Sequence, residues 1–123
     1  MDSNAGGDES QARAKLIPLV RNNETPVTFN RRELDQILRI YGFMVSAGEW
    51  RDYAIDHLMD RAVFSIFRRT SEVPMFRIEK NPRLARRQGA YSVIAAGGLI
   101  LKRGQELDRV LRIFDKSLSI VRG

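Results

Sequence analysis

Two segments of the chain repeat apolar residues at helical spacing, and the first is residues 28–48, TFNRRELDQILRIYGFMVSAG. Asn30 and Glu33 have the spacing of a capping box, which predicts that the helix begins there. Gly42 inside this pattern costs about 1 kcal/mol relative to alanine, which a close backbone contact would explain. Gly48 predicts the end. The apolar stripe of this helix is Leu34, Ile37, Leu38, Tyr41 and Val45.

The second helical pattern is at the C-terminus, in residues 105–122, QELDRVLRIFDKSLSIVR. Its opposite side carries residues of both charges, which is typical of a solvated helix face. We therefore expect this helix to pack on the same core as the first one. Its apolar stripe is Leu107, Val110, Leu111, Phe114, Leu118 and Val121.

Residues 49–60 fit either a helix or a strand, and the segment that follows favours the strand. Residues 61–69, RAVFSIFRR, alternate between apolar and polar positions. Folding the two segments about Asp60 and Arg61 brings apolar pairs to one face and polar pairs to the other. Asp-Arg is, however, not a favoured two-residue turn. The predicted pairs are Met59 with Ala62, His57 with Phe64, Ile55 with Ile66, Asp56 with Ser65 and Asp52 with Arg69.

Three further strands are expected after this hairpin. A turn at residues 70–72 leads into a strand at 73–80, with Phe76 opposite Ile66 and Ile78 opposite Phe64. Residues 90–96 and 99–103 then form a hairpin about Gly97 and Gly98. The sequence does not determine which face of this hairpin is buried, because either Ile94 with Leu101 or Val93 with Ile100 could face the core.

This order predicts one α+β domain over residues 26–123. An antiparallel four- to five-stranded meander would carry an N-terminal and a C-terminal helix packed on one face. Residues 1–25 are expected to be a disordered or loosely docked tail, whose KLIPLV patch at 15–20 could add an edge strand or dock on the core. The second sheet face stays uncovered and carries Ser65, Phe67, Arg69, Met75 and Arg77.

The net charge of +6 is concentrated in the middle of the chain. Residues 61–104 hold ten basic and two acidic residues, whereas the rest holds 11 basic and 13 acidic ones. Within this region, KNPRLARRQG at 80–89 predicts at most two helical turns, with Asn81 as the cap and Gly89 as the end. Such segregation favours a surface that binds polyanions, and a solvated basic face is the alternative.

Composition gives little support to catalysis. The chain has no cysteine and one histidine, His57, so a cluster of sulfur or histidine metal ligands is excluded. We interpret His57 as a hydrogen-bonded structural residue on the apolar face. The acids at 49, 52, 56 and 60 could surround magnesium, but pairing with arginines is the commoner arrangement. No phosphate loop or activated nucleophile is found. We expect no catalytic residue, no metal and no cofactor.

The chain also lacks the signals of an exported or membrane protein. Its N-terminus has no basic start followed by an apolar stretch. The longest apolar run, residues 90–101, is too short to span a bilayer. We expect a cytoplasmic protein without a membrane partner.

The leading functional hypothesis is non-enzymatic binding of nucleic acid, as RNA or single strands. Arginines and lysines would contact phosphates, and Phe67 on the open sheet face would stack on a base. This requires that the cations share one surface. The alternative is a protein-interaction or regulatory module, homodimeric through the open sheet face. The residues expected to contact nucleic acid are Phe67, Arg69, Arg77, Lys80, Arg83, Arg86, Arg87, Lys102 and Arg103.

Residues 31–111 resemble a known family over most of the predicted domain. The stretches that carry the likeness are RRELDQILRIYGFMVSAGEWRDYAID, DRAVFSIFRRTSEVPMFRIEKNP, RRQGAYSV and GGLILKRGQELDRVLR. They are similar to the domain of unknown function 2794 family, which we associate with alphaproteobacteria. The resemblance implies a small cytoplasmic bacterial protein. It implies no activity, ligand or catalytic residue.

Overall fold

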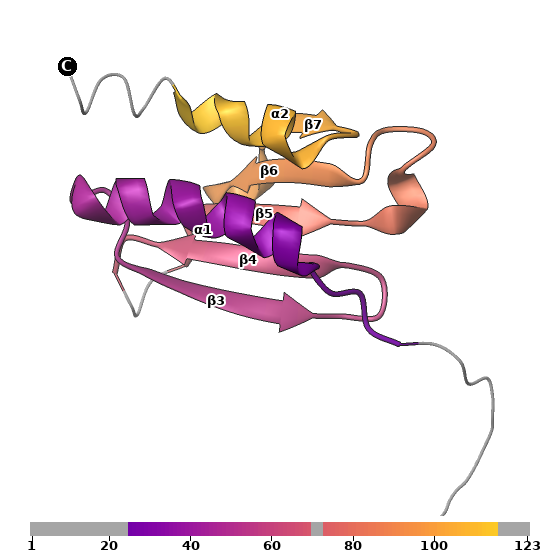
Figure 1. The fold of residues 1–123 in the computed structure, drawn as a ribbon, viewed down its shortest axis with the longest axis horizontal. Coiled ribbons are helices and arrows are strands. Elements are labelled where there is room, and N and C mark those ends of the chain that lie inside the picture. Colours follow the sequence, from indigo (N-terminus) through magenta and orange to yellow (C-terminus); the bar gives the residue numbers. More distant parts are fainter. Residues whose placement is uncertain (1–24, 70–72, 116–123) are drawn as a thin grey trace, which may run out of the picture.

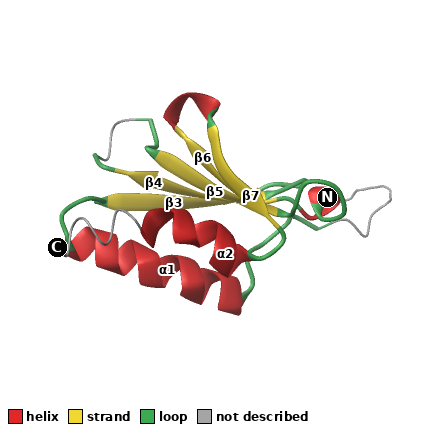
Figure 2. Cartoon of the chain, turned by 90° about the horizontal axis from the view of Figure 1, so that it is seen from above, coloured by secondary structure: helices red, strands yellow, loops and turns green. Residues whose placement is uncertain are grey.

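The fold is an open sheet of five antiparallel strands with two α-helices on one of its faces (Figures 1 and 2). The computed structural model of the chain describes residues 25–69 and 73–115. The strands lie in the order of the sequence, as the predicted α+β meander requires. The KLIPLV patch and the predicted turn at 70–72 lie outside the described residues. The elements are α1 (Arg31–Ser46), β3 (Asp52–His57), β4 (Ala62–Phe67), β5 (Phe76–Lys80), β6 (Tyr91–Ala95), β7 (Ile100–Gly104) and α2 (Leu107–Leu111), with short 3-10 turns η1 (Pro82–Leu84), η2 (Ala96–Gly98) and η3 (Arg112–Phe114).

Helix α1 begins with the predicted capping box. The Asn30 side chain accepts a hydrogen bond from the Glu33 backbone N–H at 2.8 Å, and the Glu33 carboxylate accepts one from the Asn30 N–H at 2.7 Å. The predicted stripe is confirmed in part, because Ile37 is buried and Leu34 and Tyr41 pack against the core, whereas Leu38 and Val45 are 38% and 40% exposed.

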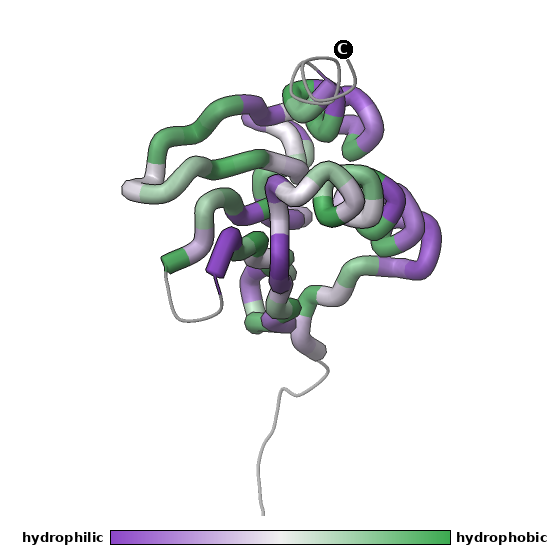
Figure 3. The backbone as a smooth tube through the Cα atoms, turned by 90° about the vertical axis from the view of Figure 1, so that its left-hand side faces the viewer, coloured by the Kyte–Doolittle hydropathy of each residue, from purple (hydrophilic) through white to green (hydrophobic). Residues whose placement is uncertain are grey.

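The buried row of α1 is centred on Ile37 and Met44 and begins at Glu33, which is itself buried. The buried face therefore extends beyond the predicted stripe to Met44 and to Glu33, a charged residue that an apolar pattern does not include. Along α1, the colours of Figure 3 alternate between hydrophobic green and hydrophilic purple.

Strands β3 and β4 form the predicted hairpin, but the predicted register is wrong by two residues. Ile55 lies opposite Phe64, and Asp52 lies opposite Phe67. The turn comes earlier than predicted, since the Leu58 N–H donates to the Arg61 carbonyl at 2.8 Å. A shift of two residues keeps every side chain on its predicted face, because strand side chains alternate with a period of two.

The predicted pairing of β4 with β5 is observed, whereas the predicted pairing of β6 with β7 is observed only in part. Ile66 opposite Phe76 and Phe64 opposite Ile78 are confirmed. The hairpin of β6 and β7 is also confirmed, and Gly97 and Gly98 both have positive φ angles, of 87° and 95°. Neither of the two alternatives for its inner face is observed, because the register shifts between Val93 and Ile94. Val93 lies opposite Lys102, and Ile94 lies opposite Ile100.

The core lies between the sheet and the helices. Trp50 contacts Phe114 with ring centroids 5.0 Å apart, and Phe76 contacts Phe114 at 5.2 Å. Within the described residues, the C-terminal helix consists of α2, Leu107–Leu111, and the 3-10 turn η3, Arg112–Phe114, and Asp115 is again α-helical. Its predicted positions Leu118 and Val121 lie outside the described residues. The described part of the stripe is confirmed, with Leu107, Val110, Leu111 and Phe114 all buried.

The interpretation of His57 as a hydrogen-bonded structural residue is wrong. His57 lies on the predicted side of β3, opposite Ala62, but it is exposed. Strand β3 is at the edge of the sheet among the described strands, so one flank of His57 has no described strand beside it. Within the described part of the chain, the imidazole has no hydrogen-bond partner.

Candidate nucleic-acid interface

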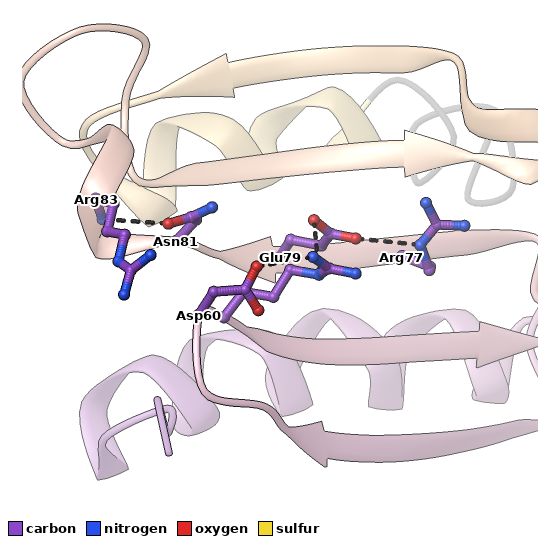
Figure 4. Close-up of polar contacts among 6 residues, drawn as sticks. Asp60, Arg77, Glu79, Asn81 and Arg83 are labelled. Carbon is purple, nitrogen blue, oxygen red and sulfur yellow. Dashed lines mark hydrogen bonds and ion pairs between the residues drawn. The ribbon is translucent and has the colours of Figure 1, made fainter. Parts of the chain in front are cut away.

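The basic segment forms a short loop between β5 and β6, which we call the η1 loop (residues 81–90). The Asn81 side chain accepts a hydrogen bond from the Arg83 backbone N–H at 3.2 Å (Figure 4). Gly89 has a φ of 99°, and its N–H donates to the Leu84 carbonyl at 2.9 Å. The predicted cap is therefore confirmed, but the helix is only the single 3-10 turn η1, Pro82–Leu84, which ends before the predicted Gly89.

The η1 loop is fixed against the end of β7. A Cβ atom at Gly89 would overlap the backbone of Gly104, so the two chain segments touch at a point where only glycine fits. The Gln105 side chain donates a hydrogen bond to the Ala85 carbonyl, and Arg103 donates one to the Gln88 side chain. These contacts tie residues distant in the sequence into one surface.

Three arginines project from this anchored loop. Arg83, Arg86 and Arg87 are all exposed. No described acidic side chain forms an ion pair with any of their guanidinium groups. No acidic side chain of the described residues therefore neutralises their charge.

The open face of the sheet has a different character, because its cations are paired. Arg77 lies 3.2 Å from the Glu79 carboxylate, and Arg61 lies 3.7 Å from the other oxygen of that group (Figure 4). Arg61 also contacts Asp60 at 3.1 Å. This predicted face is therefore a network of ion pairs rather than a uniformly cationic platform.

Lys80 lies on the helix side of β5 and binds Glu33. Its ammonium donates to the Glu33 carboxylate at 2.9 Å and to the Thr28 carbonyl at 2.8 Å. The Tyr91 hydroxyl donates to the other Glu33 oxygen at 2.5 Å. Only 18% of the Lys80 side chain and 9% of the Glu33 side chain are exposed. Lys80 therefore joins α1 to the sheet.

The same contacts shift two pKa values in this junction. Burial raises the pKa of the Glu33 carboxyl, but the hydrogen bonds from Lys80, Tyr91 and Asn30, with the Lys80 charge, together hold it below 4.5. Burial, followed by the hydrogen bond to Glu33 and the Glu33 charge, raises the pKa of Tyr91 to about 12. The junction is thus most favourable with an ionised Glu33 and a neutral Tyr91.

Lys102 and Arg103 lie on β7, beside helix α2. Two adjoining hollows, of about 500 and 410 Å³, share Lys102 and Arg109 in their lining. Arg112 lines the first hollow, and Arg103 lines the second. We call Lys102, Arg103, Arg109 and Arg112 the β7–α2 groove. The sequence analysis did not include Arg109 and Arg112 in the site. They could have been identified because a spacing of three residues places both on the same polar side of the last helix.

Arg69 and Phe67 lie at the opposite end of the sheet from the η1 loop. Ala62 pairs with Lys80 beside the loop, and β4 then runs five residues further to Phe67, which corresponds to about 17 Å. Arg69 follows that end and lines a hollow of about 420 Å³ together with Arg51 and Arg68. We call these three arginines the strand-end cluster. The predicted cations therefore do not form one continuous patch.

The described residues offer little to a metal ion or a membrane. No three acidic or histidine side chains come together in the described ranges, and Glu49 instead pairs with Arg68 at 3.2 Å. None of the described helices has the length and apolar character needed to cross a bilayer.

Comparison with known proteins gives a family but no relative of established activity. No curated protein and no solved structure matches the chain. A family described as "Protein of unknown function (DUF2794)" matches residues 27–111, which is more than half of the chain and confirms the resemblance. This range begins just before α1 and ends at the last residue of α2, so it covers the sheet, both helices and the η1 loop. The chain belongs to the DUF2794 family.

Proposed function

We propose that this protein binds nucleic acid without catalysis and that the η1 loop is the centre of its binding surface. The observation that carries the proposal is the difference in pairing among the cations. Arg83, Arg86 and Arg87 are exposed and have no acidic partner in the described part of the chain. Arginine offers a planar fork of N–H donors that matches the oxygens of a phosphate group.

The anchoring of the loop supports the same function. A ligand that orders a mobile loop loses binding free energy to that ordering, whereas a loop held in place avoids the loss. The Gly89 contact with Gly104 and the Gln105 bond to Ala85 hold the η1 backbone before any ligand arrives. Only the arginine side chains then need to adjust to the phosphates.

Several of the predicted contact residues are not included in the proposed centre. Lys80 would have to leave Glu33, and Arg77 would have to leave Glu79. Breaking the partly buried Lys80 pair leaves a charge without compensation, which is unfavourable. Phe67 is also left out, because it lies at the other end of β4.

The test is nucleic-acid binding at low ionic strength, measured by fluorescence anisotropy with labelled DNA and RNA. The Arg83→Ala, Arg86→Ala and Arg87→Ala triple variant should lose on the order of tenfold or more in affinity. The matched control replaces the strand-end cluster, Arg51, Arg68 and Arg69, with alanine and removes the same charge. Equal losses in both variants, or no binding by the wild type, would contradict the proposal.

A second candidate function, protein interaction, is favoured by the edge strand β3 rather than by the open sheet face. Tyr53 is exposed there, and Leu58 and Met59, which follow the strand, are 41% and 53% exposed. An uncovered edge strand can pair with another chain. Sedimentation of the wild type and of Met59→Lys tests this, and a monomer at all concentrations removes self-association.

A further inference from the structure

The η1 loop and the β7–α2 groove are neighbouring parts of one surface. The bond from Arg103 to Gln88 joins a groove cation directly to the loop. Gly104 touches Gly89, and Gln105 reaches Ala85. Both Gly104 and Gln105 also line the hollow that contains Lys102 and Arg109. A ligand on the loop arginines therefore has a cationic path onward toward α2.

Two of the four groove cations, Lys102 and Arg112, have no acidic partner among the described residues. Lys102 and Arg112 are exposed, and neither has an ion-pair partner in the described ranges. Arg109 pairs with Glu106 at 3.2 Å, but both of these side chains are more than half exposed. Such an exposed pair is weak and does not prevent Arg109 from contacting a phosphate.

This surface carries no described aromatic residue on which a base could stack. The described residues lining the two hollows are charged, polar, glycine or aliphatic. Tyr91 follows the η1 loop, but its hydroxyl binds Glu33 on the helix side. Trp50, Phe76 and Phe114 contact one another in the core, and Phe67 lies at the far end of β4. Sequence-tolerant binding of single strands usually relies on stacking as well as on charge.

We infer that the preferred ligand is a nucleic-acid duplex, whose phosphate backbone lies along the η1 loop and the β7–α2 groove. This inference rests on the proposed function and names its ligand class. A duplex presents about one charge per 1.7 Å of its axis and is stiff over about 50 nm. A fixed row of cations without stacking groups gains most from such a dense and rigid array. The surface contacts phosphates and not bases, so binding does not depend on the nucleotide sequence of the duplex.

The experiment compares one duplex of about 20 base pairs, a second of unrelated sequence, and the separated strands of each. Anisotropy titrations at low salt should give on the order of tenfold tighter binding to duplex than to single strands, because charge density is the main difference. The two duplex sequences should bind equally. Lys102→Gln with Arg112→Gln should weaken duplex binding severalfold, whereas Arg51→Gln with Arg68→Gln should leave it nearly unchanged.

The outcomes separate this inference from the proposed function. Single strands that bind as tightly as duplex, with full dependence on Arg83, Arg86 and Arg87, would overturn the duplex preference and leave the proposed function standing. A Lys102 and Arg112 variant with wild-type affinity would overturn the path through the groove. Absence of binding to every probe would overturn both. Circular dichroism of each variant confirms that it is folded.

Discussion

Lys80 and Arg83 are three residues apart in the sequence, yet their charges have different roles in the fold. The Lys80 ammonium lies 2.9 Å from the Glu33 carboxylate and is mostly buried between α1 and the sheet. The Arg83 side chain is exposed and has no acidic partner in the described part of the chain. The first charge stabilises the junction of α1 with β5 and β6, and the second is available to a ligand.

This difference shows why the charge of a segment does not by itself locate a binding surface. Glu33 is separated from Lys80 by 47 residues, so their pairing is invisible in the local sequence. The same holds for Arg68, which pairs with Glu49 across 19 residues. Within the basic region at residues 61–104, the three η1 loop arginines and Lys102 of the neighbouring β7–α2 groove have no acidic partner among the described residues.

The largest expected effect is a loss of stability when the buried ion pair between Lys80 and Glu33 is broken. Glu33→Gln leaves the buried ammonium without a counter-charge and should lower the free energy of unfolding by about 3 kcal/mol. Urea unfolding at neutral pH measures this. Asp35→Asn is the matched control, because it removes one exposed carboxylate from the same helix. If both variants lose the same stability, Glu33 is an ordinary surface charge and the comparison fails.

The pH dependence of stability should carry the signature of the same junction. The folded pKa of Glu33 is lowered, so its contribution is present above about pH 4.5 and is lost as the pH falls through and below that value. The folded pKa of Tyr91 is raised, so its contribution is present below pH 10 and is lost as the pH rises toward about 12. Urea midpoints across this range measure both effects. Glu33→Gln should lack the acid-side loss, and an unchanged acid dependence would contradict the assignment.

A substitution on the outer side of α1 gives a smaller effect of opposite sign. The expected close contact at Gly42 is not observed, because a Cβ atom there would meet nothing within 4 Å. Gly42→Ala should therefore raise the free energy of unfolding by about 0.5–1 kcal/mol. The same urea measurement detects it, and destabilisation would mean that the helix needs glycine at this position.

The smallest expected effect on stability comes from substitution of the exposed arginines in the η1 loop. Replacing Arg83, Arg86 and Arg87 with alanine should change the free energy of unfolding by less than about 0.5 kcal/mol per residue, because these side chains have no described partner to lose. Thermal and urea unfolding measure this. A loss comparable to that of Glu33→Gln would show that the loop arginines also hold the fold together.

The sequence predicts the elements of this fold better than their details. Alternation along β4 and β5, the capping box at Asn30 and the glycines at 97 and 98 act through neighbouring residues, so local pattern suffices. The registers of β3 with β4 and of β6 with β7 depend on where a turn closes and where a bulge falls, which the alternation does not determine. The α1 face was predicted only in part, because an apolar pattern does not include a buried charged residue such as Glu33.

The candidate site was less predictable than the fold, for a physical reason. The η1 arginines were identified because their loop is short and self-contained. Arg109 and Arg112 belong to the same surface only because Gly89 packs on Gly104, which brings the loop beside β7. Phe67 is aromatic and Arg69 is basic, as expected of a nucleic-acid-binding site. The length of β4, however, separates both residues from the η1 loop.

The most direct test of the central claim is the salt dependence of duplex binding for three proteins. The logarithm of the association constant should fall linearly with the logarithm of salt concentration, with a slope of about −0.9 per phosphate neutralised. Replacing Arg83, Arg86 and Arg87 with alanine should make that slope shallower by about 2 to 3, whereas replacing Arg51, Arg68 and Arg69 should change it by less than about 1. Identical slopes for the two variants would show that total charge, and not the unpaired arginines of the η1 loop, governs binding.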